Sequence, residues 1–127
     1  MSNRSCMTIR TATLPVLFAL ASFGAEATSS EPSGEYQKLE RGALAGNYQD
    51  QRNLAYWLSG GYGGAAPTNP VLACAWRIVI LNSGDRRVDE GDVSNKQLYC
   101  DKRLDKDAQQ AAKAQSEKLL AQVKKRK

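Results

Sequence analysis

The sequence predicts an all-α domain, a stack of short antiparallel helical hairpins with about five helices. Three observations predict this fold class. Apolar residues recur at helical spacing along residues 35–124. Good N-cap residues precede several of these stretches. The predicted turns are short, which favours antiparallel neighbours. A chain of 127 residues also fits a single domain.

The first predicted helix covers residues 35–44, with Ser33 as its cap and Gly46 at its end. The second covers residues 48–59 and ends at the stretch 60–64, because four glycines in five residues break a helix.

The third predicted helix begins at Asn69 and Pro70, since asparagine caps well and proline fits the first helical position. Residues 71–81 are apolar except for Arg77, so we expect this helix to be buried between neighbours. Residues 78–81 alone would also suit a buried strand, but the cap and the length favour a helix. Trp76 should pack against the second helix near Leu54 or Leu58.

A polar, charged loop is predicted over residues 85–92, followed by a fourth helix over residues 93–103. Asp105 can cap a fifth helix that runs to residue 124. The apolar stripe expected on the fifth helix consists of Ala108, Ala111, Ala112, Leu119, Leu120 and Val123.

Residues 1–27 have the pattern of a cleavable signal peptide. Arg4 and Arg10 precede a short apolar run over residues 14–23, and residues 25–27 fit the A-x-A cleavage pattern. The run is too short to span a bilayer, which needs roughly 20 residues. We therefore expect a periplasmic or secreted product with no integral membrane segment after processing, beginning with a disordered polar leader over residues 28–34.

Removal of the signal peptide would leave Cys74 and Cys100 as an even pair, because Cys6 lies in the removed segment. Such pairs usually form a disulfide in an oxidising compartment. The chain-entropy model gives this bridge a stabilisation of about 3.5 kcal/mol. Two unpaired thiols are the alternative.

The positive net charge of the chain comes mainly from its C-terminal residues. The whole sequence has a formal net charge of +5, and all four residues 124–127 are Lys or Arg. A short basic tail over residues 125–127 is expected to be solvated, and the domain before it is nearly neutral. A basic tail without a basic face argues against nucleic-acid binding.

The composition offers little support for catalysis or metal binding. The sequence has no histidine, which excludes Ser-His and Cys-His pairs and histidine-ligated metals. Four carboxylates do not fit a calcium loop and are expected to be solvated: Asp85, Asp89, Glu90 and Asp92. We therefore expect no enzyme activity, no cofactor and no metal.

Three aromatic residues around the glycine-rich turn are candidates for partner contact: Tyr56, Trp57 and Tyr62. Tyr56 and Trp57 fall outside the main apolar stripe of the second helix, so they are expected to be partly exposed, where aromatics can anchor a peptide or sugar. Packing against the first or third helix is the alternative, and the one that the pattern favours.

Residues 46–84 resemble the SEL-one-like repeat, a tetratricopeptide-like helical hairpin. The residues that carry the resemblance are Gly46, Gln51, Leu54, Ala55, the turn 60–67, Asn69, Ala73, Trp76, Ile80, Leu81 and Gly84. The chain departs from the pattern at Asp50, where alanine is usual, at Arg52 and Arg77, where tyrosines are usual, and at Ile80 and Leu81, which replace two alanines. One full repeat is fewer than a solenoid needs, so the other helices would act as caps.

This resemblance implies a short exported module that mediates protein–protein interaction in the cell envelope with an unknown protein partner. The alternative is a small enzyme, or an enzyme inhibitor, acting in the envelope. Converging carboxylates in a deep pocket would favour an enzyme, and a shallow aromatic groove would favour a binding protein.

Overall fold

The computed structural model describes residues 33–61 and 68–125, and over these ranges the chain is helical with no strand. The elements are α1 (Gly34–Leu44), α2 (Tyr48–Leu58), α3 (Pro70–Leu81), α4 (Glu90–Lys96), the π-helical segment η1 (Gln97–Lys102) and α5 (Lys106–Lys125). The all-α prediction is confirmed. The predicted signal peptide 1–27, most of the leader 28–34, Tyr62 and residues 126–127 lie outside the described residues.

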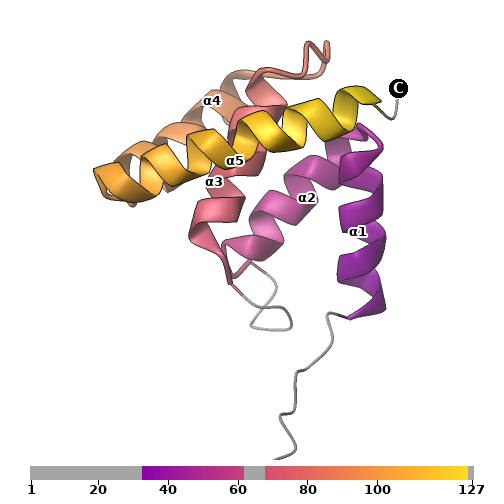
Figure 1. The fold of residues 1–127 in the computed structure, drawn as a ribbon, viewed down its shortest axis with the longest axis horizontal. Coiled ribbons are helices and arrows are strands. Elements are labelled where there is room, and N and C mark those ends of the chain that lie inside the picture. Colours follow the sequence, from indigo (N-terminus) through magenta and orange to yellow (C-terminus); the bar gives the residue numbers. More distant parts are fainter. Residues whose placement is uncertain (1–32, 62–67, 126–127) are drawn as a thin grey trace, which may run out of the picture.

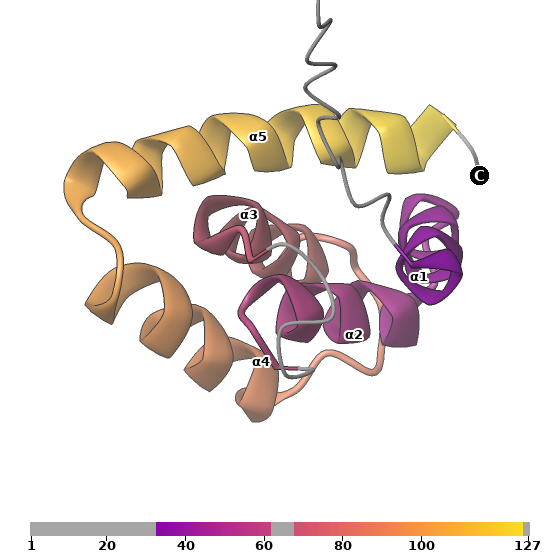
Figure 2. The ribbon, with the colours of Figure 1, turned by 90° about the horizontal axis from the view of Figure 1, so that it is seen from below.

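Helix α3 lies at the centre of the domain (Figure 1). It packs against α2 on one side, α5 on another and the α4–η1 segment on a third. Viewed from below, α5 runs along one edge of the molecule while α4 and η1 lie at the opposite edge (Figure 2). Helix α1 packs on α2 and near the end of α5. The central position of α3 explains why its sequence is apolar on nearly every side.

The first two helices form an antiparallel pair through a tight turn. Ser33 Oγ accepts a hydrogen bond from the Tyr36 amide at 3.3 Å, and the Asn47 side chain caps α2. Gly46 has a φ of 87°, a left-handed conformation that glycine adopts without steric cost. Buried Gln51 donates from Nε2 to the Ala43 carbonyl at 3.1 Å, which ties α2 to the end of α1.

Helix α3 begins where the sequence predicted, since Asn69 accepts a hydrogen bond from the Leu72 amide and Pro70 is the first helical residue. It continues to Leu81, so the alternative of a strand over residues 78–81 is wrong. Trp76 is 2% exposed and belongs to the same core cluster as Leu54 and Leu58 of α2. The expected burial of Trp76 against the second helix is confirmed.

The fourth helix begins earlier than predicted. Asp89 caps it and forms a reciprocal capping box with Asp92, so residues 90–92 are the first turn of α4 and not part of a loop. Asp92 is 4% exposed, and the expectation of a solvated carboxylate there is wrong. The physical reason is that Asp92 finds several partners inside the domain. The Asp-x-x-Asp spacing was visible in the sequence as a helix start.

The Cys74–Cys100 disulfide joins α3 to η1, with the two Cα atoms 5.3 Å apart. The predicted pairing is confirmed. Both cysteines are buried in a small cluster with Ala112 of α5. On α5, Ala112 and Val123 of the predicted stripe are buried, and Leu119 and Leu120 are partly buried against the core. Ala108 is also partly buried, Ala111 is exposed, and Ser116, which was not predicted, is buried.

Candidate functional site

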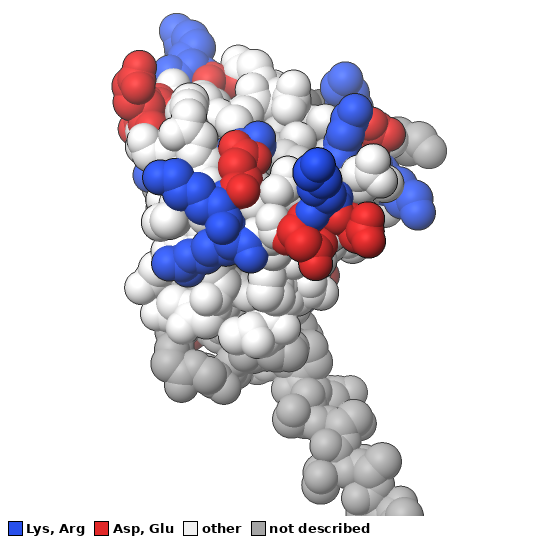
Figure 3. Space-filling view, turned by 90° about the vertical axis from the view of Figure 1, so that its left-hand side faces the viewer, with Lys and Arg blue, Asp and Glu red and all other residues white. Residues whose placement is uncertain are grey.

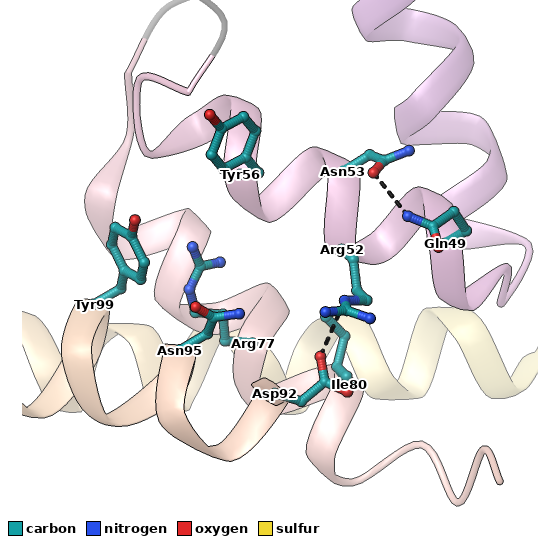
Figure 4. Close-up of a pocket in the computed structure, with 9 residues that line it drawn as sticks. All are labelled: Gln49, Arg52, Asn53, Tyr56, Arg77, Ile80, Asp92, Asn95 and Tyr99. Carbon is teal, nitrogen blue, oxygen red and sulfur yellow. Dashed lines mark hydrogen bonds and ion pairs between the residues drawn. The ribbon is translucent and has the colours of Figure 1, made fainter. Parts of the chain in front are cut away.

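A polar pocket of about 400 Å³ opens between α2, α3 and the α4–η1 segment (Figure 4). Helix α2 supplies four lining residues along one face, α3 supplies two from its C-terminal half, and α4 and η1 supply the rest. The lining residues are Gln49, Arg52, Asn53, Tyr56, Arg77, Ile80, Asp92, Asn95 and Tyr99. This size is within the range of pockets that hold small ligands or single side chains.

One wall of the pocket is held by Asp92. Its Oδ2 accepts hydrogen bonds from the Tyr48 hydroxyl at 2.7 Å and from the Asp89 amide at 3.1 Å. Its Oδ1 lies 3.2 Å from Nε of Arg52, and Arg52 Nη1 also donates to the Tyr48 hydroxyl at 3.1 Å. A buried carboxylate is stable only when it is paired and hydrogen-bonded, and these contacts satisfy that requirement. They fix α4 against α2.

The same carboxylate affects Tyr48. Burial raises the pKa of the Tyr48 hydroxyl above its ordinary value, and the hydrogen bond and negative charge of Asp92 act in the same direction. The neutral phenol is therefore the favoured form in the folded protein, where it serves as the donor to Asp92.

Arg77 occupies the α3 side of the pocket and is 6% exposed. Its Nη2 donates to Ser59 Oγ at 3.2 Å, while its Nε is buried without a hydrogen-bond partner. Burial lowers the pKa of the Arg77 guanidinium from its ordinary value, and neighbouring Tyr99 partly opposes this effect. Arginine nevertheless stays charged in proteins, so the site contains a buried cation.

Tyr99 forms the η1 side of the pocket, and its ring contacts two guanidinium groups. The Arg77 guanidinium carbon is 4.1 Å from the centroid of the Tyr99 ring, and that of Arg103 is 4.5 Å from it. These cation–π contacts hold the plane of the Arg77 guanidinium in place. Figure 4 shows the guanidinium projecting toward the space between Tyr56 and Tyr99.

The structure separates the three aromatic residues predicted for partner contact. Tyr56 is 47% exposed at the edge of the pocket. Its ring lies against Gly61, where an added Cβ would collide with it. Trp57 is 4% exposed and packs edge-on against Tyr36 of α1, with ring centroids 6.1 Å apart. The favoured prediction, that Trp57 packs against the first or third helix, is confirmed, because α1 covers that side of α2. Tyr62 is outside the described residues.

The described lining of the pocket offers hydrogen-bonding groups and charged groups. Asp92 is its single carboxylate among the described residues, and that group is engaged by Tyr48 and Arg52. The amides of Asn53, Asn95 and Gln49 can donate and accept hydrogen bonds. With two arginines and one aspartate, the described lining carries a net charge of +1.

Other kinds of site find less support in the described residues. Over residues 33–61 and 68–125, no group of three or more metal-ligating side chains comes together. In the same part of the chain, no helix is both long and apolar enough to cross a membrane. On the face shown in Figure 3, basic and acidic side chains alternate instead of forming a patch of one sign.

Sequence reasoning missed most of this site. It singled out Tyr56 but not Arg52, Arg77, Asn95 or Tyr99 as binding residues. One signal was present, since Arg77 is the single charged residue in the apolar run over residues 71–81. A charge at such a position must either find a partner or face a cavity.

Comparison with protein-family models finds no match for this chain, and neither curated proteins nor solved structures give one. The resemblance to the SEL-one-like repeat thus stays a prediction from residues 46–84.

Proposed function

We propose that this chain is an exported helical module that binds a protein partner through the polar pocket between α2, α3 and the α4–η1 segment. The observation that carries the proposal is the polar pocket, which has an exposed aromatic residue, Tyr56, at its edge and a buried arginine, Arg77, within it. Tyrosine and arginine are enriched among the residues that dominate binding energy at protein interfaces. The SEL-one-like pattern of residues 46–84 supports the same function.

The alternative of a small envelope-acting enzyme receives less support from the pocket. General acid–base or glycosidase chemistry needs a free acid or base, and commonly two carboxylates. The carboxylate of Asp92 is already bound by the Tyr48 hydroxyl and by Arg52. We therefore favour a binding module over an enzyme.

Export to the periplasm or the exterior is part of the proposal. The signal-peptide pattern of residues 1–27 supports it, and the Cys74–Cys100 disulfide is compatible with an oxidising compartment. The intact mass of the chain purified from its own host tests this point. A mass matching a chain that begins near residue 28 supports export, and a full-length chain in the cytoplasm contradicts it.

Partner binding is tested by affinity capture from the native envelope fraction, with residues 28–127 as bait and the disulfide intact. The informative variant is Tyr56→Ala. Leu98→Ala is the matched control, because Leu98 is also an exposed apolar side chain, at 38%, but does not line the pocket. A partner retained by wild type and Leu98→Ala but lost by Tyr56→Ala supports the proposal. Equal capture by all three baits contradicts it, and so does the absence of any reproducible partner.

A further inference from the structure

The guanidinium of Arg77 is a buried cation with no anionic partner among the described residues. The ion pairs of this part of the chain join Arg52 to Asp92, Arg87 to Asp85 and Lys96 to Asp101, and none involves Arg77. Burying a charge costs several kcal/mol unless it is paired. The described residues give the Arg77 guanidinium a hydrogen bond and a cation–π contact, but no ion pair.

The neighbouring carboxylate does not fill this role. Asp92 lines the same pocket, but its Oδ1 pairs with Arg52 and its Oδ2 accepts from Tyr48 and from the Asp89 amide. Arg103 also lies over the Tyr99 ring and adds a second positive charge nearby. The pocket therefore lacks one negative charge.

The orientation of Arg77 is fixed before any ligand arrives. Ser59 Oγ holds Nη2, and the Tyr99 ring covers one face of the guanidinium at 4.1 Å. Nε is buried without a hydrogen-bond partner, and the side chain lines the cavity between Tyr56 and Tyr99. The two oxygens of a carboxylate can pair with the Nε–H and an Nη–H of one guanidinium, and the unsatisfied Nε–H of Arg77 is one of these donors.

We propose that the pocket binds a carboxylate carried by an acidic side chain of the partner, with Arg77 as the residue that recognises it. This inference rests on the proposed function only in assigning the carboxylate to a protein. The amides of Asn53 and Asn95 line the same cavity and can hydrogen-bond the peptide that bears the acid. A singly charged carboxylate balances the net +1 of the described lining, whereas a doubly charged phosphate would exceed it.

The test is an NMR titration of the processed chain with four N-acetylated tetrapeptide probes. One has a Glu side chain and an amidated end, one is all alanine with a free terminal carboxylate, and one is all alanine and amidated. The fourth has phosphoserine in place of Glu. The signals followed are the side-chain Nε–H of Arg77 and the backbone amides of residues 95–103.

The Glu probe should shift these signals saturably, with a dissociation constant in the millimolar range, about −4 kcal/mol. The neutral probe should cause no saturable shift. Arg77→Met keeps the apolar stem and should weaken Glu-probe binding at least about tenfold. Arg103→Gln is the matched control, because it removes the other cation on Tyr99 without changing the pocket lining, and it should retain binding within about threefold.

Several results would overturn the inference. They are the absence of saturable binding by the Glu probe, equal binding of the neutral probe, and unchanged affinity in Arg77→Met. Tighter binding of the free terminal carboxylate would reassign the source of the acid, and tighter binding of phosphoserine would reassign its chemistry, so either contradicts the proposal as stated. A partner captured through Tyr56 while the Glu probe fails would leave the proposed function intact. Glu-probe binding without any captured partner would reject the function and leave the carboxylate site.

Discussion

The apolar interior formed by α1, α2, α3 and the end of α5 is stabilised differently from the attachment of α4 and η1. The first is an apolar core in which Trp76, Leu54 and Leu58 are almost completely buried. The second depends on a disulfide and on the polar contacts of Asp92 with Tyr48 and Arg52. The pocket lies along the boundary between these two regions.

This difference shows how a small domain can hold a polar pocket open. An apolar interface would close over the space between α2 and η1, because burial of apolar surface is favourable and does not depend on direction. Hydrogen bonds and a disulfide fix distances instead, so they hold α4 and η1 in place while leaving polar groups exposed to the cavity.

The largest effect is expected from Trp76→Ala, which removes the largest of the fully buried side chains in the apolar core. Truncation of a buried aromatic residue typically costs about 3–5 kcal/mol of unfolding free energy. Urea unfolding of both proteins with the disulfide intact measures this loss. A loss under about 1 kcal/mol would show that α2 and α3 do not form the core described above.

Removal of the disulfide by the paired change Cys74→Ala and Cys100→Ala should cost about 3.5 kcal/mol in the chain-entropy model. The destabilisation should be greatest near the lost bridge. Relative to wild type, amide hydrogen exchange should accelerate more in residues 97–102 than in α2. Equal acceleration of exchange throughout the domain would contradict the separation into two regions.

Asp92→Asn should destabilise the domain by about 1–3 kcal/mol, because it removes a charged acceptor from a buried network. Asp101→Asn is the control, since Asp101 forms an exposed ion pair with Lys96 that should contribute less than about 1 kcal/mol. Thermal or urea unfolding measures both changes. Similar losses for the two variants would show that the Asp92 network does not hold α4.

Tyr48 should make stability depend on pH in the alkaline range. Its pKa is raised in the folded state by burial and by Asp92, so folding favours the neutral phenol. The contribution of Tyr48 to the free energy of unfolding is complete below the unfolded-state pKa of about 10. It is lost as the pH rises from there through the folded-state pKa. Tyr48→Phe should flatten this decline in urea unfolding at alkaline pH. The substitution should not abolish the decline in stability, because burial also raises the pKa of Tyr36.

Local sequence signals were enough to predict much of the fold but few of the residues that form the pocket. The caps at Ser33 and Asn69 and the apolar run containing Trp76 placed the first three helices, because these signals act over neighbouring residues. Asp92 was misplaced because its partners are distant in sequence, with Tyr48 lying 44 residues away. For Trp57 the sequence favoured packing but left exposure open, because the position of α1 decides which of the two occurs.

The pocket shows the same limit. Arg52 and Arg77 are the two positions where arginine replaces the tyrosine usual in the SEL-one-like pattern, and both line the cavity. The sequence therefore marked them as departures. It could not show that one arginine has Asp92 as its partner while the other has none, since that depends on how α4 meets α2.

The central claim is that Arg77 binds a ligand and does not stabilise the fold. Its most direct test is the unfolding free energy of Arg77→Met, measured by urea unfolding without ligand. Replacing an unpaired buried charge with an apolar side chain of similar length is often neutral or stabilising. We predict a stability within about 1 kcal/mol of wild type, or above it, after the loss of the Ser59 hydrogen bond and the Tyr99 contact. A loss of more than about 2 kcal/mol would show that Arg77 stabilises the fold, and it would contradict the account.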